Sequence, residues 1–160
     1  MKIVKFNNLN KKEKEIFYYL DKIIYNSYNP YSKFYVASAV LTTNNKIFYG
    51  VNIETCAYTY ICAERTAIGN AVTSGYYKFN KIFILAKSDY FKVKILSVPC
   101  GICRRIIYEF SELIKRDIQI LIADSELKRV LKTSIRKLHP YSFGPRLCKG
   151  DYKKYLRNQK

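Results

Sequence analysis

The sequence has few of the features that mark a secreted or membrane protein. Its 160 residues contain no tryptophan, one methionine, one histidine and only five cysteines. No apolar stretch has the length of a signal-peptide core, and none approaches the roughly 18 residues that a membrane span needs. We therefore expect a cytoplasmic protein without a membrane segment. A chain of this length predicts one domain with its own hydrophobic core.

Acidic residues are also scarce, with 12 aspartates and glutamates against 29 lysines and arginines, which gives a net charge of +17. Such a charge is compatible with nucleic-acid binding. However, the lysines are scattered along the chain, and the abundance of Asn, Ile and Tyr is typical of an A+T-rich coding sequence. We interpret the charge as compositional bias and expect no nucleic-acid partner. Residues 1–145 are predicted to form the domain, and residues 146–160 a basic C-terminal tail.

Five cysteines cannot all pair, so a disulfide framework is not expected. Three of them stand in two short motifs, Cys62-Ala63-Glu64-Arg65 and Pro99-Cys100-Gly101-Ile102-Cys103-Arg104. Structural zinc normally has four protein ligands, whereas catalytic zinc keeps three and leaves a position for water. The three thiolates therefore predict a catalytic site, with one zinc per chain bound by Cys62, Cys100 and Cys103.

A structural zinc site would need a fourth ligand, and the three candidates are poorly placed. Cys56 lies six positions before Cys62, which is not a usual ligand spacing. Cys148 belongs to the basic tail, and His139 precedes Pro140, as expected for a surface or packing residue.

Glu64 follows the first of these ligands by two positions, so its carboxylate can lie beside the metal without binding it. There it can take a proton from water and return it to a substrate. The order of ligand-x-Glu followed by Pro-Cys-x-x-Cys is the layout of zinc deaminases. The pattern therefore predicts Glu64 as the catalytic residue.

Zinc with three thiolates is a centre of net charge −1, which holds the proton of its water more tightly than a site containing neutral histidine. Positive charge close to the ligands is therefore required. The candidates are Arg65, three positions after Cys62, and Arg104, directly after Cys103. The N-termini of the two helices that begin near Cys62 and Cys100 add their positive dipole ends.

Further segments accompany the cysteine motifs: Asn29-Pro30-Tyr31-Ser32-Lys33-Phe34-Tyr35-Val36, Asn52-Ile53-Glu54 and Ser142-Phe143-Gly144-Pro145. Together with those motifs, they occur in the order and approximate spacing found in the small homo-oligomeric cytidine deaminases. The sequence resembles that family over roughly residues 11 to 145. The resemblance implies zinc-dependent hydrolysis of cytidine and deoxycytidine to uridine and deoxyuridine, with release of ammonia.

The resemblance also implies roles for individual residues. It implies that Asn52 and Glu54 hold the ribose hydroxyls, that Phe34 packs against the base, and that Ala63 contacts the substrate. Arg65 would hydrogen-bond the zinc thiolates. Tyr58 and Phe143 match positions that reach the site of a neighbouring subunit, so a homotetramer with shared active sites is expected.

The chain departs from the family pattern at several positions. Ala37-Ser38 replaces the usual Gly-Ala, the loop between Glu54 and Cys62 is one residue short, and Arg105 stands where glutamine is common. Arg146-Leu147 replaces acidic residues. These differences affect the predicted pocket shape and subunit packing, and they leave the zinc ligands and Glu64 in place.

Hydrophobic periodicity predicts an alternation of helices and strands. A helix is expected from Asn10 with Glu13 in a capping box, and further helices over 62–74, 100–110 and from Thr133. Strands are expected over 34–41 and 47–53 as a hairpin, and over 81–86, 118–122 and about 127–131. An α/β fold follows, with a mixed sheet of about five strands. The resemblance implies the three-layer α/β/α fold of cytidine deaminases.

Three functions remain open on the sequence. The first is deamination of free cytidine and deoxycytidine. The second is deamination of another aminopyrimidine nucleoside of the blasticidin type, and Glu54 with the Cys-Ala-Glu-Arg motif speaks against it. Polynucleotide and nucleotide deaminases usually have His as the first zinc ligand, so the all-cysteine ligand set speaks against those two classes of enzyme. The third is a non-enzymatic zinc domain that binds nucleic acid through its charge, with binding that depends steeply on salt.

Overall fold

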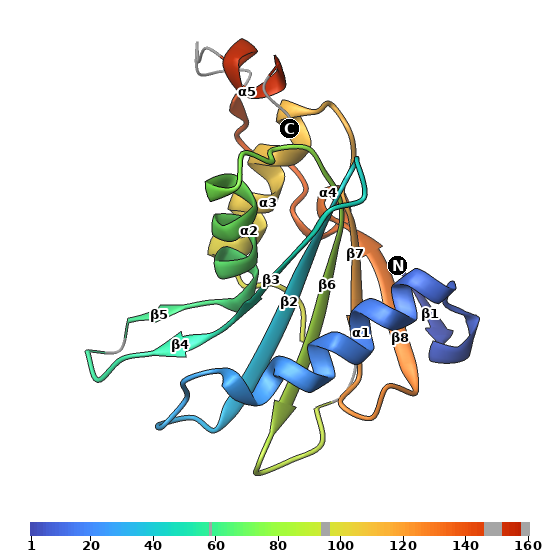
Figure 1. The fold of residues 1–160 in the computed structure, drawn as a ribbon, viewed down its shortest axis with the longest axis vertical. Helices are drawn as coiled ribbons and strands as arrows, with labels where there is room; N and C mark the ends of the chain where they lie inside the picture. The colour runs from blue at the N-terminus through green and yellow to red at the C-terminus, as the bar shows by residue number, and fades with distance from the viewer. Residues whose placement is uncertain (58, 94–96, 146–151, 158–160) are drawn as a thin grey trace.

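The protein folds as an alternation of strands and helices, seen in the computed structural model of Figure 1. The structure describes residues 1–57, 59–93, 97–145 and 152–157. In chain order the elements are β1 (Lys2–Lys5), η1 (Phe6–Asn8), α1 (Lys11–Ile23), η2 (Ile24–Asn26), β2 (Phe34–Thr42), β3 (Ile47–Val51), β4 (Ile53–Glu54), β5 (Tyr60–Ile61), α2 (Ala63–Thr73), β6 (Phe79–Ser88), α3 (Gly101–Leu113), β7 (Gln119–Ala123), β8 (Arg129–Ser134), α4 (Ile135–Leu138) and α5 (Lys153–Arg157).

The main sheet is mixed and has the strand order β1-β8-β7-β6-β2-β3. Strands β6 and β7 are parallel, and the other neighbouring pairs in this sheet are antiparallel. The sequence predicted about five strands, and the sixth is β1, which pairs with β8 at the sheet edge. This strand has four residues, two of them lysines, so its local sequence carries little strand signal.

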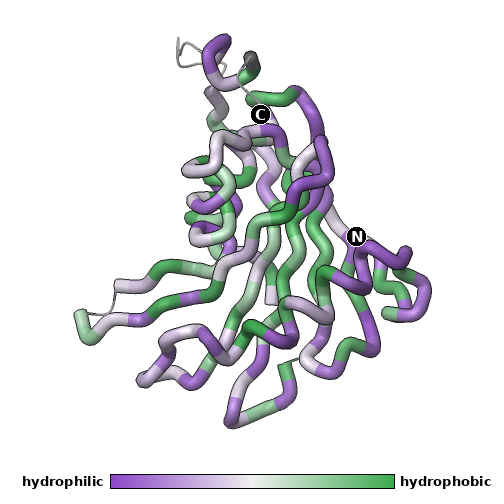
Figure 2. Tube along the Cα trace, in the orientation of Figure 1, coloured by the Kyte–Doolittle hydropathy of each residue, from purple (hydrophilic) through white to green (hydrophobic). Residues whose placement is uncertain are grey.

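Helices cover both faces of the sheet, which confirms the predicted three-layer α/β/α architecture. On one face α1 packs its apolar side against residues such as Ala39 of β2 and Phe83 of β6. On the other face α2, α3 and α4 pack against the alternate residues of the same strands, including Val40 and Ile82. Figure 2 shows how apolar residues concentrate along the central strands, as expected for strands buried on both sides.

Helix α1 begins where its capping residue predicts. The Asn10 side chain accepts a hydrogen bond from Glu13 N at 2.9 Å, which satisfies one of the free amides at the helix start. The second half of the expected capping box is replaced by a tertiary contact. The buried Glu13 carboxylate instead accepts from Lys81 Nζ at 2.7 Å and Lys132 Nζ at 3.1 Å. Two strands of the sheet thereby hold the first turn of α1.

The two helices expected to carry the cysteine motifs form within a few residues of their predicted bounds. Helix α2 ends at Thr73 and is followed by Gly75, whose φ of 85° suits glycine. Tyr76 N donates to Ala71 O and Gly75 N to Val72 O, both at 2.9 Å, so the last carbonyls are satisfied as in a Schellman motif. Helix α3 continues past the predicted end, to Leu113.

The expected strand over residues 47–53 is divided at Asn52. Strand β3 ends at Val51, where it still pairs with Ala37 of β2. Strands β4 and β5 form a separate two-stranded sheet in which Glu54 pairs with Tyr60. Figure 1 shows this ribbon projecting away from the main sheet. The chain therefore leaves the sheet edge directly before α2.

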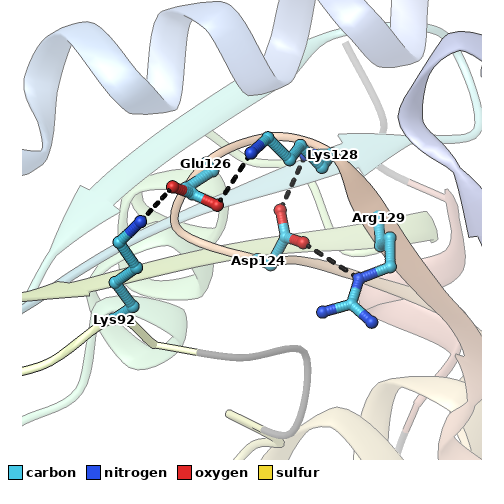
Figure 3. Close-up of polar contacts among 5 residues, drawn as sticks. All are labelled: Lys92, Asp124, Glu126, Lys128 and Arg129. Atoms are coloured by element: carbon cyan, nitrogen blue, oxygen red, sulfur yellow. Dashed lines mark hydrogen bonds and ion pairs between the residues drawn. The ribbon is translucent and has the colours of Figure 1, made fainter.

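The turn between β7 and β8 is held by charged side chains (Figure 3). Asp124 Oδ1 accepts from Lys128 N at 2.7 Å, and Lys92 Nζ lies 2.7 Å from Glu126 Oε1. Ser125 N also donates to Val93 O at 3.0 Å. These contacts tie the segment after β6 to the turn.

The described part of the predicted tail contains α5. Its Tyr155 ring lies edge-on to Tyr77, with ring centroids 5.2 Å apart, so α5 contacts the domain. Residues 146–151, including Cys148 and Arg146-Leu147, lie outside the described residues. Among the helices that the structure describes, none has the length and apolar composition to cross a membrane.

Candidate active site

Two helix N-termini bring the three motif cysteines together. Cys62 is the N-cap of α2, Cys100 is the N-cap of α3, and Cys103 lies in the first turn of α3. Their three sulfur atoms lie within 4.8 Å of one another. The predicted ligand set therefore converges in space, although 38 positions separate Cys62 from Cys100 in sequence.

The geometry of this cluster suits zinc. Cys62 Sγ and Cys100 Sγ are 3.6 Å apart, far longer than a disulfide bond of about 2.05 Å. Tetrahedral zinc with Zn–S bonds of about 2.3 Å would separate two sulfurs by about 3.8 Å. Three thiols within 4.8 Å of one another, at two helix N-termini, therefore offer a ligand set for a zinc ion.

The surroundings of Cys62 favour ionisation of its thiol. The pKa of Cys62 is lowered to about 6, chiefly by a hydrogen bond from the Cys103 thiol. Burial opposes this effect, while Cys100 and the charge of Arg65 lower the pKa further. The pKa of Cys103 is raised by its hydrogen bond to Cys62 and by burial. Cys62 thus reaches the thiolate form that binds metal before Cys103 does.

Glu64 lies in the first turn of α2, two residues after Cys62, and is 5% exposed. Burial raises the pKa of Glu64 to about 7, and the charge of Cys62 acts in the same direction. A carboxyl group with a pKa near neutrality can both accept and donate a proton at physiological pH. The arrangement can therefore support general acid–base chemistry.

The two motif arginines have different surroundings. The Arg65 guanidinium lies beside Cys62, whose pKa it lowers, and its Nη2 donates to Tyr60 O in β5. Arg104 Nε donates to Pro99 O at 2.7 Å and its Nη1 to Leu138 O at 3.3 Å. These bonds join the start of α3 to the end of α4.

A cavity of about 520 Å³ opens in front of the cysteines. Seven of the predicted site residues line it: Phe34, Asn52, Glu54, Cys62, Ala63, Glu64 and Cys100. Cys103 is fully buried in the first turn of α3. The cavity walls come from β2, β4, β5, β6, the start of α2 and the segment before α3. Such a site combines apolar walls with a few polar groups, as small-molecule sites do.

Other residues of the lining were not predicted from the sequence: Ser32, Val36, Tyr60, Ile84, Ser97 and Val98. Ser32 and Val36 belong to the motif that contains Phe34, and Val98 directly precedes Pro99, so adjacency was an available signal. Nothing in the sequence around Ile84 indicated that it would line the cavity, because a residue of β6 reaches the site only through the pairing of β6 with β2.

Asn52 and Glu54 both reach the cavity, but their side chains already bind the backbone. Asn52 Oδ1 accepts from Val36 N at 2.8 Å, and Asn52 Nδ2 donates to Phe34 O at 3.0 Å. Glu54 Oε2 accepts from Tyr31 N at 3.2 Å and from Ser32 N at 3.1 Å. Burial by itself would raise the pKa of Glu54. The hydrogen bonds from the Ser32 side chain and from the backbone amides of Ser32 and Tyr31 together lower the pKa by more, so that it lies below its ordinary value. Glu54 is thus held as a carboxylate.

Two predicted site residues, Phe143 and Tyr58, are not among the described residues that line this cavity. Phe143 is 60% exposed, and its carbonyl accepts a hydrogen bond from Arg105. It is absent from the described lining of the cavity in its own chain. The Arg105 side chain, at a position where glutamine is common in the family, therefore binds the backbone of the segment that contains Phe143. Tyr58 lies outside the described residues.

Comparisons with known proteins agree with this geometry. The sequence model of the cytidine and deoxycytidylate deaminase zinc-binding region matches residues 10–118. The cytidine deaminase of Mycoplasma pneumoniae is 44% identical over 95 residues, which cover 58% of this chain and 67% of that protein. The blasticidin-S deaminase of Bacillus cereus is 31% identical over 120 residues, which cover 70% of this chain and 79% of that protein.

The fold agrees as well. The crystal structure of cytidine deaminase from Burkholderia pseudomallei matches with a TM-score of 0.70 and 27% identity, covering 84% of this chain and 100% of that one. The layered fold and the cluster of three cysteines with a buried glutamate define a zinc-binding enzyme. The chain belongs to the cytidine and deoxycytidylate deaminase family. A non-enzymatic nucleic-acid-binding domain is thereby set aside.

Proposed function

We propose that this enzyme hydrolyses cytidine and deoxycytidine to uridine and deoxyuridine and releases ammonia. The observation that carries the proposal is the buried Glu64 beside three converging thiols at one cavity. Family membership and the name of the Mycoplasma pneumoniae relative support it. A reducing compartment such as the cytoplasm would keep the ligand thiols free.

Cys62, Cys100 and Cys103 would hold one zinc ion per chain. When bound, zinc supplies a Lewis acid that brings the pKa of a water molecule close to neutrality. Arg65 offsets part of the negative charge of the thiolates, and we assign Arg104 the weaker role of fixing the start of α3. The positive ends of α2 and α3 face the same sulfurs.

Glu64 performs the proton transfers. Its carboxylate takes a proton from the attacking water and passes it to N3 of the pyrimidine ring as the oxygen adds to C4. Glu64 then carries the second proton from that oxygen to the departing amine, so that the C4–N bond breaks and ammonia leaves. Water and cytidine are consumed, and uridine and ammonia are formed. The raised pKa of Glu64 suits both directions of transfer.

The cavity walls would orient the nucleoside. Phe34 and Val36 offer apolar surface to the base, and Ala63 lies next to Glu64 where the ring must approach. Glu54, a carboxylate on the same cavity, is assigned to the sugar hydroxyls, with Asn52 beside it. Residues 1–145 would form the catalytic unit, and the tail 146–160 would lie outside it.

Phe143 and Tyr58 are assigned to the site of a neighbouring subunit in a homotetramer. The exposure of Phe143 and its separation from the cavity of its own chain support this assignment. A tetramer of identical chains would have closed symmetry.

A second candidate substrate is a blasticidin-type aminopyrimidine nucleoside, which the 31% identity to the Bacillus cereus blasticidin-S deaminase favours. The proposal is tested by measuring ammonia release from cytidine, deoxycytidine, cytidine monophosphate, blasticidin S and a cytosine-containing oligonucleotide. The control is the Glu64→Gln enzyme, purified in the same way. We expect rapid release from the two nucleosides alone. Release confined to blasticidin S, or none from any nucleoside, would overturn the proposal.

A further inference from the structure

One face of α3 contacts the chain that follows α4. Arg104 Nη1 donates to Leu138 O at 3.3 Å, and one helical turn further along α3 the Tyr108 ring lies edge-on to His139, with ring centroids 5.7 Å apart. Residues four positions apart share one face of a helix. Gly144 reaches the same tyrosine, because a Cβ atom on Gly144 would be 3.2 Å from Tyr108 Cε1. Helix α3 therefore contacts both ends of this short segment.

The turn between these ends carries Phe143. Tyr141 has a φ of 56°, in the left-handed region that non-glycine residues seldom adopt. Ser142 Oγ donates to His139 O at 2.6 Å within the turn. Phe143 is 60% exposed, so packing against its own chain does little to fix the ring. The direction of the ring therefore depends on how the backbone of Phe143 is held.

Arg105 holds this backbone from α3. Its Nη1 donates to Phe143 O, and its Nη2 lies 3.6 Å from Glu109 Oε2, one helical turn away. The guanidinium has donors on separate nitrogens of a rigid plane, so it can bind the Glu109 carboxylate and the Phe143 carbonyl together. Glutamine, which is common at this position in the family, is shorter and has no charge to attract Glu109. The arginine of this chain is therefore suited to join α3 to the segment of Phe143.

The same helix carries two of the cluster thiols. Arg105 lies two positions after Cys103, and Cys100 is the N-cap of α3. The Arg105 side chain is not among the described residues that line the cavity. One helix thus supports the metal ligands of its own chain and the backbone of Phe143, which is assigned to a neighbouring site.

We propose that Arg105 is a positioning residue, which fixes the exposed Phe143 ring for use in the active site of a neighbouring subunit. This inference rests on the proposed function, because the ring contributes to the reaction only through such a site. Arg105 acts through Phe143 and does not touch the reacting atoms. Its loss should therefore weaken substrate binding and leave metal binding and proton transfer intact.

Steady-state kinetics with cytidine, together with metal analysis, test this division. We expect Arg105→Ala to raise KM by about three- to tenfold, the scale of one hydrogen bond, with kcat and zinc content near the parent values. Arg105→Lys, which keeps a charged donor for the Phe143 carbonyl, should recover part of the binding. The control is Arg116→Ala, which removes an exposed arginine beyond the end of α3. A parent-like KM, or a loss of zinc, in Arg105→Ala would overturn the proposal.

Mixed oligomers show in which subunit Arg105 acts. Phe143→Ala chains mixed with Glu64→Gln chains would form working sites from the Glu64 of one chain and the Phe143 of the other. Adding Arg105→Ala to the Glu64→Gln chain, which supplies Phe143, should raise the KM of the recovered activity. Adding it to the Phe143→Ala chain should leave that KM unchanged. Equal effects of the two placements would assign Arg105 to general stability and reject the positioning role.

A third measurement depends neither on turnover nor on the mixing of subunits. 4-Fluorophenylalanine placed at position 143 reports the surroundings and mobility of the ring through its ¹⁹F resonance. Arg105→Ala should shift or narrow that resonance, whereas Arg116→Ala should leave it unchanged. An unaltered resonance in Arg105→Ala would show that the guanidinium does not hold Phe143.

The two proposals fail in different ways. A parent enzyme that releases no ammonia from cytidine contradicts the proposed function, and the ¹⁹F measurement then still decides whether Arg105 holds Phe143. An active parent without recovery in the mixed oligomers contradicts shared sites, which overturns this inference and leaves the proposed reaction standing. If Arg105→Ala does not fold, Arg105→Lys carries all three measurements, with smaller changes in the same direction.

Discussion

Gly50 of β3 lies directly against the backbone of Ala67 in α2: a Cβ atom on Gly50 would be 2.3 Å from Ala67 N. It would also lie 2.7 Å from Ala63 O, the atom that a regular α-helix joins to Ala67 N by a hydrogen bond. Strand and helix therefore meet without an intervening side chain. Because the obstructing atoms are backbone, no rotamer change can make room. This contact sets the distance of Cys62 and Glu64 from the sheet.

Gly50→Ala should therefore displace the start of α2 and lower kcat by about 10²-fold, the scale of a misplacement of about 1 Å. Steady-state kinetics and the visible spectrum of the cobalt-substituted enzyme would measure the effect on the site. Gly69→Ala on the same helix is the matched control and should keep both parent values. A parent-like kcat and cobalt spectrum in Gly50→Ala would show that the helix can move without consequence.

Cys103→Ala should lose zinc and activity together, because the three sulfurs within 4.8 Å form the ligand set. Metal analysis of the purified variant against the parent, expected at one zinc per chain, measures this. Cys56→Ala provides the control, since Cys56 is exposed and outside the cluster. Full zinc retention in Cys103→Ala would reject the assignment of the ligands.

Glu64→Gln should keep zinc while the rate constant falls by at least about 10²–10⁴-fold, the range of general acid–base catalysis. Glutamine preserves the size and polarity of the buried side chain but cannot transfer protons. Single-turnover kinetics with parallel metal analysis separates chemistry from metal binding. Near-normal turnover would assign the proton transfers to another group.

Glu13 should make folding stability depend on acid. Burial raises its pKa, but the hydrogen bonds and charges of Lys81 and Lys132 lower it by more, so the folded-state pKa lies below the ordinary value. A carboxyl group of this kind stabilises the fold above its unfolded pKa of about 4.3, and the contribution is lost as pH falls through the folded pKa.

Glu13→Gln should therefore be less stable than the parent by about 1.5–3 kcal/mol at pH 7, the scale of hydrogen bonds to charged groups. The difference should shrink as the pH falls below about 4, where the parent carboxyl is protonated. Urea unfolding of both proteins across this range measures it. A difference that stays constant with pH would assign the effect to packing.

Phe143→Ala chains mixed with Glu64→Gln chains should regain activity if sites are shared between subunits. We expect each parent variant to be nearly inactive alone, whereas a mixed oligomer of the proposed kind would place an intact Glu64 beside an intact Phe143 from a neighbour. Ammonia release after subunit exchange, verified by native mass spectrometry, measures the recovery. No recovery despite proven mixing would return Phe143 to its own chain.

Local sequence determined much of this protein. The spacing of apolar residues predicted α1, α2 and α3, and Asn10 and Gly75 marked helix ends where the structure has them, because caps depend on neighbouring residues alone. The cysteine motifs and Glu64 also predicted the chemistry, since three thiolates and one carboxylate are the groups that a catalytic metal and a proton carrier require.

Tertiary structure decided how these parts meet. Glu13 was expected to complete a capping box and instead binds Lys81 and Lys132, which are 68 and 119 positions away. The division of the strand at Asn52 follows from competition between Tyr28 and Val36 for the same backbone groups, and periodicity along one segment cannot register that competition. The strand β1 and the cavity wall at Ile84 likewise depend on pairing between distant segments. Residue order therefore specified the reacting groups, while long-range pairing specified the cavity in which they act.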